Sequence, residues 1–389
     1  MLIGIVGKTN CGKSTFFKAA TLANVEIANR PFVTLKPNVG IGYVRVKCPK
    51  PAGKNCKPNH GFCLQGERFV PVKLIDVAGL VPEAYLGKGR GNEFLDDLRE
   101  ADCFVHIVDA SGRTNEQGEA TENYPIEKDI EFIEKEIEFW ILGILKRNWK
   151  SLERKAASTS LAFEITNQLT GLKIKEDDVK GIISKLNLNE KGNWIDNDLL
   201  KFAIEIRKKS KPMIIAANKA DLEESRENIK KLKEKFPDLL VIPCSSDYEV
   251  ALREASKAGL IDYVLGDSDF KIKGNLSKQQ EKALEKIKGF LEKNKTTGIQ
   301  DCLNKAVFDF LKFIVVYPVE NEHHLSDKKG NILPDAFLLQ ENSTALDLAF
   351  AVHTDIGNKF IGAIDCKTGK KLGKDSKLKN GDIVKILTK

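Results

Sequence analysis

Short apolar runs alternate with helical patterns along the first part of the chain. The runs are rich in β-branched residues, as buried strands are, and they cover 2–7, 69–77, 103–110, 212–219 and 239–246. Amphipathic helical patterns lie between or after most of them, at 12–23, 92–101, 221–236 and 250–259. Strands that alternate with helices predict an α/β fold, with a mostly parallel sheet and right-handed crossovers.

The alternation breaks between 114 and 205. Large apolar residues recur there at alternating spacings of four and three, at Ile126, Ile130, Ile133, Ile137, Trp140 and Ile144. This spacing predicts a long amphipathic helix with a coiled-coil-like seam, and Leu161, Ile165 and Leu169 indicate a second helix that runs back. The segment is far longer than a loop of ~2–6 residues, so we expect a protruding helical insert. The alternative is that these helices simply pack on the sheet.

Helical patterns return at 275–313, and short alternating runs follow from 314 around one helical pattern at 344–353. A strand-rich end with a single helix predicts a small, separate α+β domain. A chain of 389 residues is too long for one ordinary core. The predicted division is therefore 1–113 with 206–274, an insert at 114–205, a helical connector at 275–313 and a C-terminal domain at 314–389.

The composition adds limits to this picture. Hydrophobic residues make up 42% and charged residues 30%, as in globular proteins, and no apolar run approaches the ~18–20 residues of a membrane span. The first residues show no basic region and no cleavage site, so no signal peptide is expected. Eight cysteines are spread along the chain, which favours reduced thiols and a cytoplasmic protein without a membrane partner.

The net charge of +7 indicates a binding surface only if the positive residues cluster in one part of the chain. Lysines crowd the end of the chain: Lys367, Lys370, Lys371, Lys374, Lys377, Lys379, Lys385 and Lys389. Asp365, Asp375 and Asp382 lie among them, so one interpretation is a solvated face. The other is a contact surface for RNA.

Residues 7–14 match the GxxxxGK[ST] pattern after a strand and at the start of a helix. In such a loop, backbone N–H groups surround phosphate oxygens, Lys13 reaches the β- and γ-phosphates, and Ser14 ligates Mg²⁺. The helix N-terminus adds partial positive charge. The predicted phosphate-binding residues are Gly7, Lys8, Thr9, Asn10, Cys11, Gly12, Lys13, Ser14 and Thr15.

Two later motifs point to the base of a nucleotide. Asn218, Lys219 and Asp221 form NKAD at the end of an apolar run, and Ser245 and Ser246 end the next run. A carboxylate at Asp221 can accept from the N1–H and N2–H₂ groups of guanine, whereas adenine would leave it unpaired. Carboxyl ends of parallel strands share one edge, so these motifs predict a single crevice.

A fourth motif, DxxG, runs from Asp76 to Gly79 and is followed by Leu80. In this order the motifs resemble those of the translation-factor class of P-loop GTPases. The closer resemblance is to the Obg/YchF branch, in its archaeal and fungal subgroup, with a C-terminal TGS domain. It rests on 29–40 with Thr34, on 44–63, on 76–95, and on the TGS-like stretches 344–364 and 378–387.

That resemblance implies a GTP hydrolase with slow intrinsic turnover, in which a hydrophobic residue replaces the usual catalytic Gln, as Leu80 does. It implies catalysis by Lys13, Asn10, Thr34 and Gly79. Mg²⁺ would lie on Ser14 and Thr34 with Asp76 behind them, and K⁺ beside Asn10. The same resemblance implies a monomeric switch on the ribosome or an RNA–protein complex, with no DNA specificity.

Several YchF proteins with an altered NKxD motif accept ATP, whereas this chain keeps NKAD. The alternatives are a YchF-type ATPase and a non-hydrolysing nucleotide-dependent RNA-binding adaptor.

One further cluster lies outside these motifs. Cys48, Cys56, His60 and Cys63 fall within sixteen residues as C-x7-C-x3-H-x2-C. Three thiolates and one imidazole can hold a tetrahedral Zn²⁺. Free thiols and a disulfide-bonded hairpin are the alternatives. His106, inside an apolar run, is expected to be a core residue.

Overall fold

The computed structural model describes residues 1–21, 39–49, 56–77 and 99–389. The chain divides into two compact units, which are described separately. The first unit comprises Met1–Phe17 with Leu74–Glu249, and the second comprises Lys18–Lys73 with Val250–Lys389. Among the described residues, no helix has the length and apolar character that a membrane crossing needs.

The first unit is built on a parallel sheet. Neighbouring strands in it are β1 (Leu2–Val6), β5 (Cys103–Asp109), β6 (Met213–Asn218) and β7 (Leu240–Pro243). Every residue of β5 and β6 is buried, which explains why both read as unbroken apolar runs. The helices that follow strands are α1 (Lys13–Thr21), α7 (Ser225–Lys235) and α8 (Ser246–Lys257). The predicted α/β alternation is confirmed, while the helical pattern at 92–98 lies outside the described residues.

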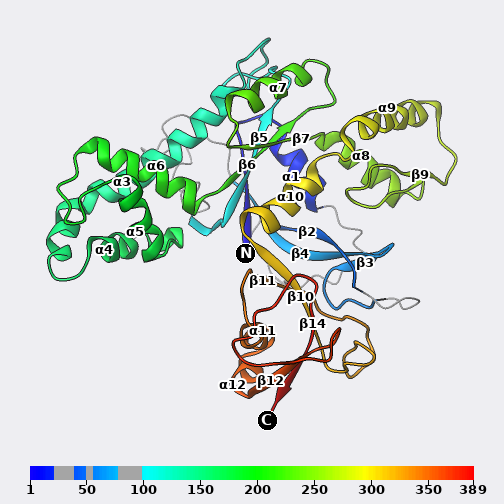
Figure 1. Cartoon of the computed structure of the whole chain (residues 1–389). Coiled ribbons are helices and arrows are strands. Elements are labelled where there is room, and N and C mark those ends of the chain that lie inside the picture. Colours follow the sequence, from blue (N-terminus) through cyan, green and yellow to red (C-terminus); the bar gives the residue numbers. More distant parts are fainter. Residues whose placement is uncertain (22–38, 50–55, 78–98) are drawn as a thin grey trace. The chain divides into compact units, whose positions relative to one another are not determined.

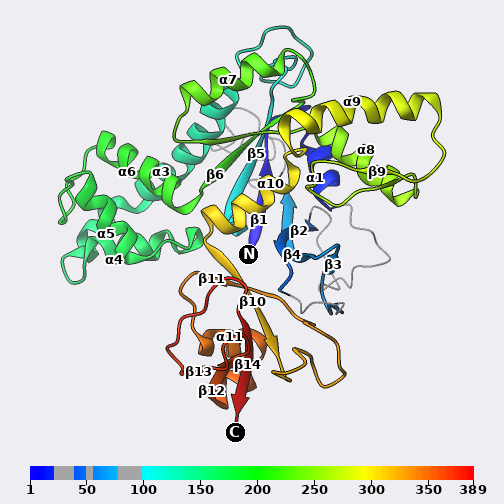
Figure 2. The same ribbon diagram turned by 45° about the vertical axis from the view of Figure 1, so that its right-hand side comes forward.

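The helical insert holds more helices than the pattern predicts. Residues 114–210, all of them described, contain α3 (Glu127–Ala156), α4 (Leu161–Gln168), α5 (Glu176–Lys185) and α6 (Asp196–Ser210). The long helix is α3, and α6 lies beside it in both ribbon views (Figures 1 and 2). The buried face of α3 also takes in Ile141, Leu145 and Trp149. A face this wide needs partners on more than one side, so a two-helix hairpin would leave part of it exposed.

The second unit begins with strands that the apolar pattern shows only in part. They are β2 (Val39–Lys47), β3 (Phe62–Leu64) and β4 (Glu67–Asp76), whose last residues belong to the first unit. β3 and β4 pair antiparallel with Phe62 opposite Phe69, and the two rings stack with centroids 4.5 Å apart. Further along are a small ladder, β8 (Ile261–Asp262) with β9 (Lys271–Ile272), and the helices α9 (Lys278–Asn294) and α10 (Ile299–Asn304).

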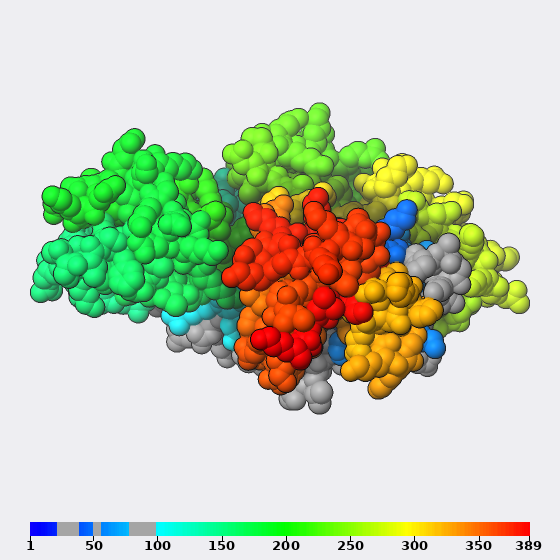
Figure 3. All heavy atoms as spheres, turned by 60° about the horizontal axis from the view of Figure 1, so that its bottom comes forward, coloured from blue at the N-terminus to red at the C-terminus, as the bar shows by residue number. Residues whose placement is uncertain are grey.

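The end of the chain forms the predicted α+β domain. Its sheet has the order β11 (Phe337–Gln340), β10 (Phe313–Val319), β14 (Ile383–Thr388), β12 (Phe360–Asp365), β13 (Lys371–Leu372). Two helices, α11 (Ala345–Val352) and α12 (Thr354–Asn358), accompany it. Thr344 caps α11, because its hydroxyl accepts from the Asp347 N–H at 3.2 Å. In the space-filling view the orange and red residues form one continuous body (Figure 3).

Candidate functional site

The loop between β1 and α1 has the shape of a phosphate cradle. Gly12 adopts φ +93°, and a Cβ there would lie 2.1 Å from the Asn218 Nδ2 atom. A Cβ at Gly7 would lie 2.7 Å from the Ile107 carbonyl oxygen. Both positions therefore require glycine, because the loop runs against its neighbours without room for a side chain. Helix α1 begins at Lys13, so the N–H groups of its first turn are left for an anion.

One asparagine joins the loop to two other parts of the sheet edge. The Asn218 amide donates to the Cys11 carbonyl at 3.1 Å. Its Oδ1 atom accepts from the Ser246 N–H at 3.1 Å and from the Ser246 hydroxyl at 2.8 Å. The P-loop, the end of β6 and the start of α8 are thus brought together, as the crevice expectation requires.

Beside this bridge, the Ser245 hydroxyl donates to Asp221 Oδ1 at 2.7 Å. Ser245 is fully buried, whereas Asp221 is only partly buried. The serine holds one carboxylate oxygen, and Asp221 keeps part of its surface exposed. Ser245 therefore acts here through its side chain, which orients the Asp221 carboxylate.

Asp109 is a site residue that the sequence reasoning missed. It ends β5 and accepts from Lys219 Nζ at 2.8 Å, from the Ser111 hydroxyl at 2.6 Å and from the Thr114 hydroxyl at 2.9 Å. Burial disfavours its charge, but these donors outweigh burial and hold the pKa of Asp109 below its ordinary value. Its place at a strand's carboxyl end, like that of Asp76 and Asn218, was the signal that could have found it.

The same network assigns Lys219 a structural position. Its ammonium contacts the Asp109 carboxylate and also donates to the Asn10 carbonyl at 3.4 Å. Lys219 therefore links two strand ends to the P-loop.

Lys8 and Asn10 connect the P-loop to the segment that leads into the insert. The Lys8 ammonium is buried, lies 2.9 Å from Asp129 of α3 and donates to the Thr114 carbonyl at 2.7 Å. Burial raises the pKa of Asp129 to about 6, although Lys8 opposes this rise. The Asn10 amide donates to the Gly118 carbonyl at 2.9 Å. Lys8 thus contributes its backbone to the cradle, while its ammonium group is occupied by Asp129 and the Thr114 carbonyl.

Asp76 lies at the end of β4, where the DxxG motif begins. Its Oδ1 atom is buried and accepts no hydrogen bond from the described residues. Burial raises the pKa of Asp76, and the positive charge of Lys13 opposes that rise. A buried carboxylate oxygen without a donor, close to the P-loop lysine, fits a site completed by a cation and its waters. Thr34, Gly79 and Leu80 lie outside the described residues.

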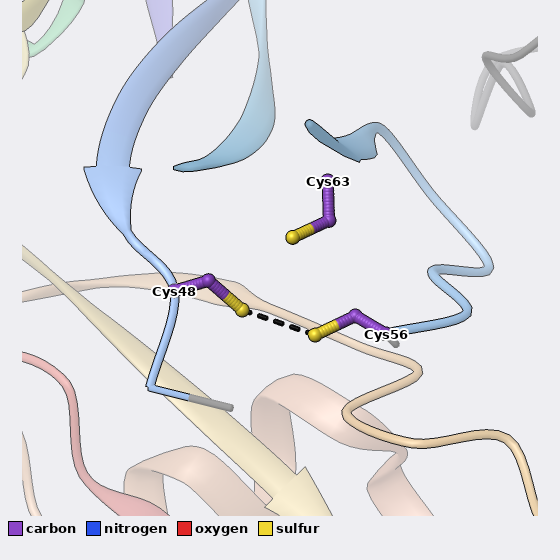
Figure 4. Close-up of side chains that lie close together, drawn as sticks. All are labelled: Cys48, Cys56 and Cys63. Atoms are coloured by element: carbon purple, nitrogen blue, oxygen red, sulfur yellow. Dashed lines mark hydrogen bonds between the residues drawn. The ribbon is translucent and has the colours of Figure 1, made fainter. Parts of the chain in front are cut away.

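The cysteine cluster lies in the second unit. The sulfur atoms of Cys48, Cys56 and Cys63 lie within 4.8 Å of one another, and their side chains converge from separate segments (Figure 4). His60 is exposed and is not part of this group. His106 is wholly buried in β5, as expected of a core residue.

Three family models match the chain. A model of 50S ribosome-binding GTPases matches residues 2–142, and a model of the G4 motif-containing domain of YGR210-like Obg-like GTPases matches 216–321. A model of the TGS domain matches 328–388. The P-loop and the NKAD motif fall within the first and second of these matches, and the TGS match covers every strand of the C-terminal sheet except β10.

Similar proteins extend over the whole chain. An uncharacterized GTP-binding protein of Methanocaldococcus jannaschii is 49% identical over 100% of this chain and 99% of its own length. One of Schizosaccharomyces pombe is 33% identical over 89% of this chain and 88% of its own length. A protein of Buchnera aphidicola named ribosome-binding ATPase YchF is 26% identical over 99% of this chain and 98% of its own.

A solved structure agrees with these similarities. The crystal structure of a GTP-binding protein from Pyrococcus horikoshii superposes with a TM-score of 0.79 at 40% identity, over the full length of both chains. The architecture is therefore that of a P-loop GTPase with a helical insert and a C-terminal TGS domain.

Proposed function

The chain belongs to the Obg-like GTPases, in the YGR210-like subgroup with archaeal and fungal members, and from this we propose a nucleotide-dependent switch. As a GTP-binding protein of this family, it would hydrolyse GTP slowly and act on the ribosome or on another RNA–protein complex. We place the GTP-binding domain at 1–113 with 206–274, the insert at 114–205, the connector at 275–313 and the TGS domain at 314–389.

The observation that carries the proposal is the hydrogen-bonded edge around Asn218. Its side chain joins the phosphate loop to α8, and Asp221 lies three residues further on with Ser245 behind it. Guanine offers this carboxylate two donors, and adenine would leave it unpaired. The intact NKAD motif therefore favours GTP, although the Buchnera relative is named an ATPase.

The phosphate side supports hydrolysis by position and charge. Lys13 and Ser14 open α1, and Asp76 offers a buried oxygen without a donor. These groups fit Mg²⁺, which when bound neutralises charge that develops on the phosphates. Thr34 and Gly79 remain predicted participants. Leu80 carries no hydrogen-bonding group, so we expect slow turnover until a partner fixes the attacking water.

The phosphate loop also contains the predicted K⁺ ligand, Asn10. Its amide nitrogen is engaged by Gly118, so the side-chain oxygen is the atom that K⁺ would use. If this is right, replacing K⁺ by Na⁺ should slow turnover, and Asn10→Ala should remove the difference.

The TGS domain supports an RNA or ribosome partner. Of the lysines that crowd the end of the chain, seven are exposed: Lys367, Lys370, Lys371, Lys374, Lys377, Lys379 and Lys389. Lys385 instead pairs with Glu322 at 3.0 Å. Several exposed lysines on one small domain suit a phosphate backbone, with binding that weakens as salt rises. We expect a cytoplasmic monomer.

Two measurements test this function. Competition between ATP and GTP for the purified protein should favour GTP clearly, whereas equal affinities would support the ATPase alternative. Single-turnover hydrolysis with and without ribosomes should be slow alone and faster with ribosomes. No hydrolysis in either condition would leave the non-hydrolysing adaptor as the better account.

A further inference from the structure

We propose that Cys48, Cys56 and Cys63 bind one zinc ion as three thiolates, with an open fourth position, and that the site holds the β3–β4 hairpin against residues 332–334. This site is separate from the nucleotide crevice. It does not depend on which nucleotide the protein binds or hydrolyses.

The three sulfur atoms already have nearly the spacing of a zinc site. Cys48 directly follows β2, Cys56 lies in the loop beyond it, and Cys63 lies in β3. All three sulfur atoms lie within 4.8 Å of one another, and those of Cys48 and Cys56 are 3.0 Å apart (Figure 4). With Zn–S bonds of about 2.3 Å, tetrahedral thiolates lie about 3.8 Å apart. Shifts of about 1 Å would therefore complete the geometry.

A buried arginine next to this cluster has no anionic partner within the described part of the chain. Arg68 on β4 is 0% exposed, and among the described residues no carboxylate forms an ion pair with it. Its Nε atom has no hydrogen-bond partner among the residues that the structure describes. A buried guanidinium without a counter-ion is unfavourable and stays charged, so this pocket needs a negative charge.

A zinc ion with three thiolates supplies that charge. Two positive charges and three negative ones leave a net charge of −1, which matches the single positive charge of Arg68. Neutral thiols would leave Arg68 unpaired, whereas the metal-bound form neutralises it.

The position of the cluster indicates what the ion would do. Arg68 donates to the carbonyls of Leu333 at 2.9 Å and Pro334 at 3.3 Å. The Lys57 and Asn59 N–H groups donate to the carbonyls of Ile332 and Pro334 at 3.0 and 2.8 Å. These residues directly precede β11 of the TGS domain. The ion would therefore fix a loop and an arginine that together hold the segment entering this domain.

Metal analysis of the full chain, purified without chelator and without added metal, tests the proposal directly. We expect about one zinc per chain, because structural thiolate sites bind tightly at neutral pH. Cys56→Ser and Cys63→Ser should lower the ratio to near zero. The matched control is Cys366→Ser, since this partly buried cysteine lies in the same unit outside the cluster, and it should keep its zinc.

A second measurement covers the case in which the cysteine variants fail to fold. Wild-type protein stripped with a chelator and titrated with Co²⁺ should develop the thiolate-to-cobalt absorption of a tetrahedral site. Arg68→Met should weaken Co²⁺ binding by about 10–100-fold, as loss of a group around a metal site does. Stripping should also speed hydrogen exchange at the amides of Lys57 and Asn59, and zinc should restore their protection.

Three results would overturn the proposal. They are wild-type protein free of zinc that gives no cobalt spectrum, a Cys48–Cys56 disulfide in freshly purified protein, and iron with acid-labile sulfide in place of zinc. None of them bears on GTP binding, so the two proposals fail independently.

Discussion

The nucleotide crevice and the cysteine cluster differ in whether their buried polar groups have hydrogen-bond partners. In the crevice, Asn218 uses both ends of its amide and Asp109 accepts from several donors. Beside the cluster, the Arg68 Nε atom and the Tyr317 hydroxyl have no hydrogen-bond partner in the described parts of the chain. Buried polar groups are nearly always satisfied in native proteins. Around Asn218 and Asp109 the protein itself thus supplies the partners, whereas the cluster is incomplete without a ligand.

The exception within the crevice supports the same reasoning. Among the described residues, the Asp76 Oδ1 atom has no donor, and it lies where the motif places the cation that accompanies the phosphates. In both regions, the unsatisfied atom occurs where a bound ion would complete the site. The predictions below test whether each region behaves as this difference requires.

The largest effect is expected at the phosphate end of the crevice. Lys13→Ala should weaken GTP binding by about 3 kcal/mol or abolish it, because hydrogen bonds to charged groups contribute about 1.5–3 kcal/mol each. Titration with a fluorescent GTP analogue measures the loss. Lys18→Ala is the matched control on the same helix, since Lys18 is exposed and pairs with Glu254 at 2.7 Å, and it should bind normally. Equal affinity in both variants would remove Lys13 from the phosphate site.

The base end should show a smaller effect that also changes specificity. Asp221→Asn should cost about 1.5–3 kcal/mol of GTP affinity through lost charge-assisted bonds. Xanthine carries a carbonyl oxygen where guanine has its amino group, so the variant should gain affinity for XTP. Equilibrium binding of both nucleotides measures this exchange. If Asp221→Asn loses GTP without gaining XTP, the carboxylate does not contact the base.

The bridge between these ends should contribute to stability even without nucleotide. Asn218→Ala should lower the free energy of unfolding by about 1–3 kcal/mol, since it leaves buried partners at Cys11 and Ser246 unsatisfied. Urea denaturation of the nucleotide-free protein measures this. Asn228→Ala removes a single bond to the Ala110 carbonyl and should cost less. Equal costs for the two variants would contradict the view that the crevice is assembled in advance.

The sequence predicts the crevice better than its surroundings, for a physical reason. Phosphate and base recognition needs particular residues at short spacings, so Gly12, Lys13 and Asp221 can be read from local motifs. Lys8 and Asp129 meet across more than a hundred residues, and no local pattern marks that pair. The sequence predicted two of the four α-helices of the insert. The regular apolar spacing marks only the helices whose buried face forms a continuous stripe.

The cluster illustrates the opposite limit. The spacing of Cys48, Cys56 and Cys63 was visible in the sequence, but the need for an anion arises from Arg68, which looks like an ordinary strand residue. His60 belonged to the predicted set by proximity in sequence alone, and its side chain is exposed. Closeness in the sequence therefore identifies candidate ligands, and the structure shows which of them lie together and are buried.

The smallest effect concerns His106, a buried residue with two unsatisfied nitrogens and no apparent ligand. Unlike Arg68, an imidazole can avoid the cost of burial by staying neutral. Burial, with the charge of Lys8, lowers the pKa of His106 to about 3. The unfolded chain takes up this proton near pH 6.5. Stability from the neutral imidazole is therefore complete above about pH 6.5 and is lost as the pH falls towards 3.

Comparison with His106→Leu isolates this contribution, because other titrating groups are common to both proteins. Relative to the variant, the wild type should lose about 1.4 kcal/mol between pH 7.5 and 5.5, and the loss should grow by a similar amount with each further pH unit. Urea denaturation at several pH values measures the difference. Parallel curves would mean that the folded protein protonates His106 freely, so its nitrogens would have partners after all. The missing partner of the Arg68 Nε atom would then no longer indicate a bound ion, although the charge of Arg68 cannot be removed.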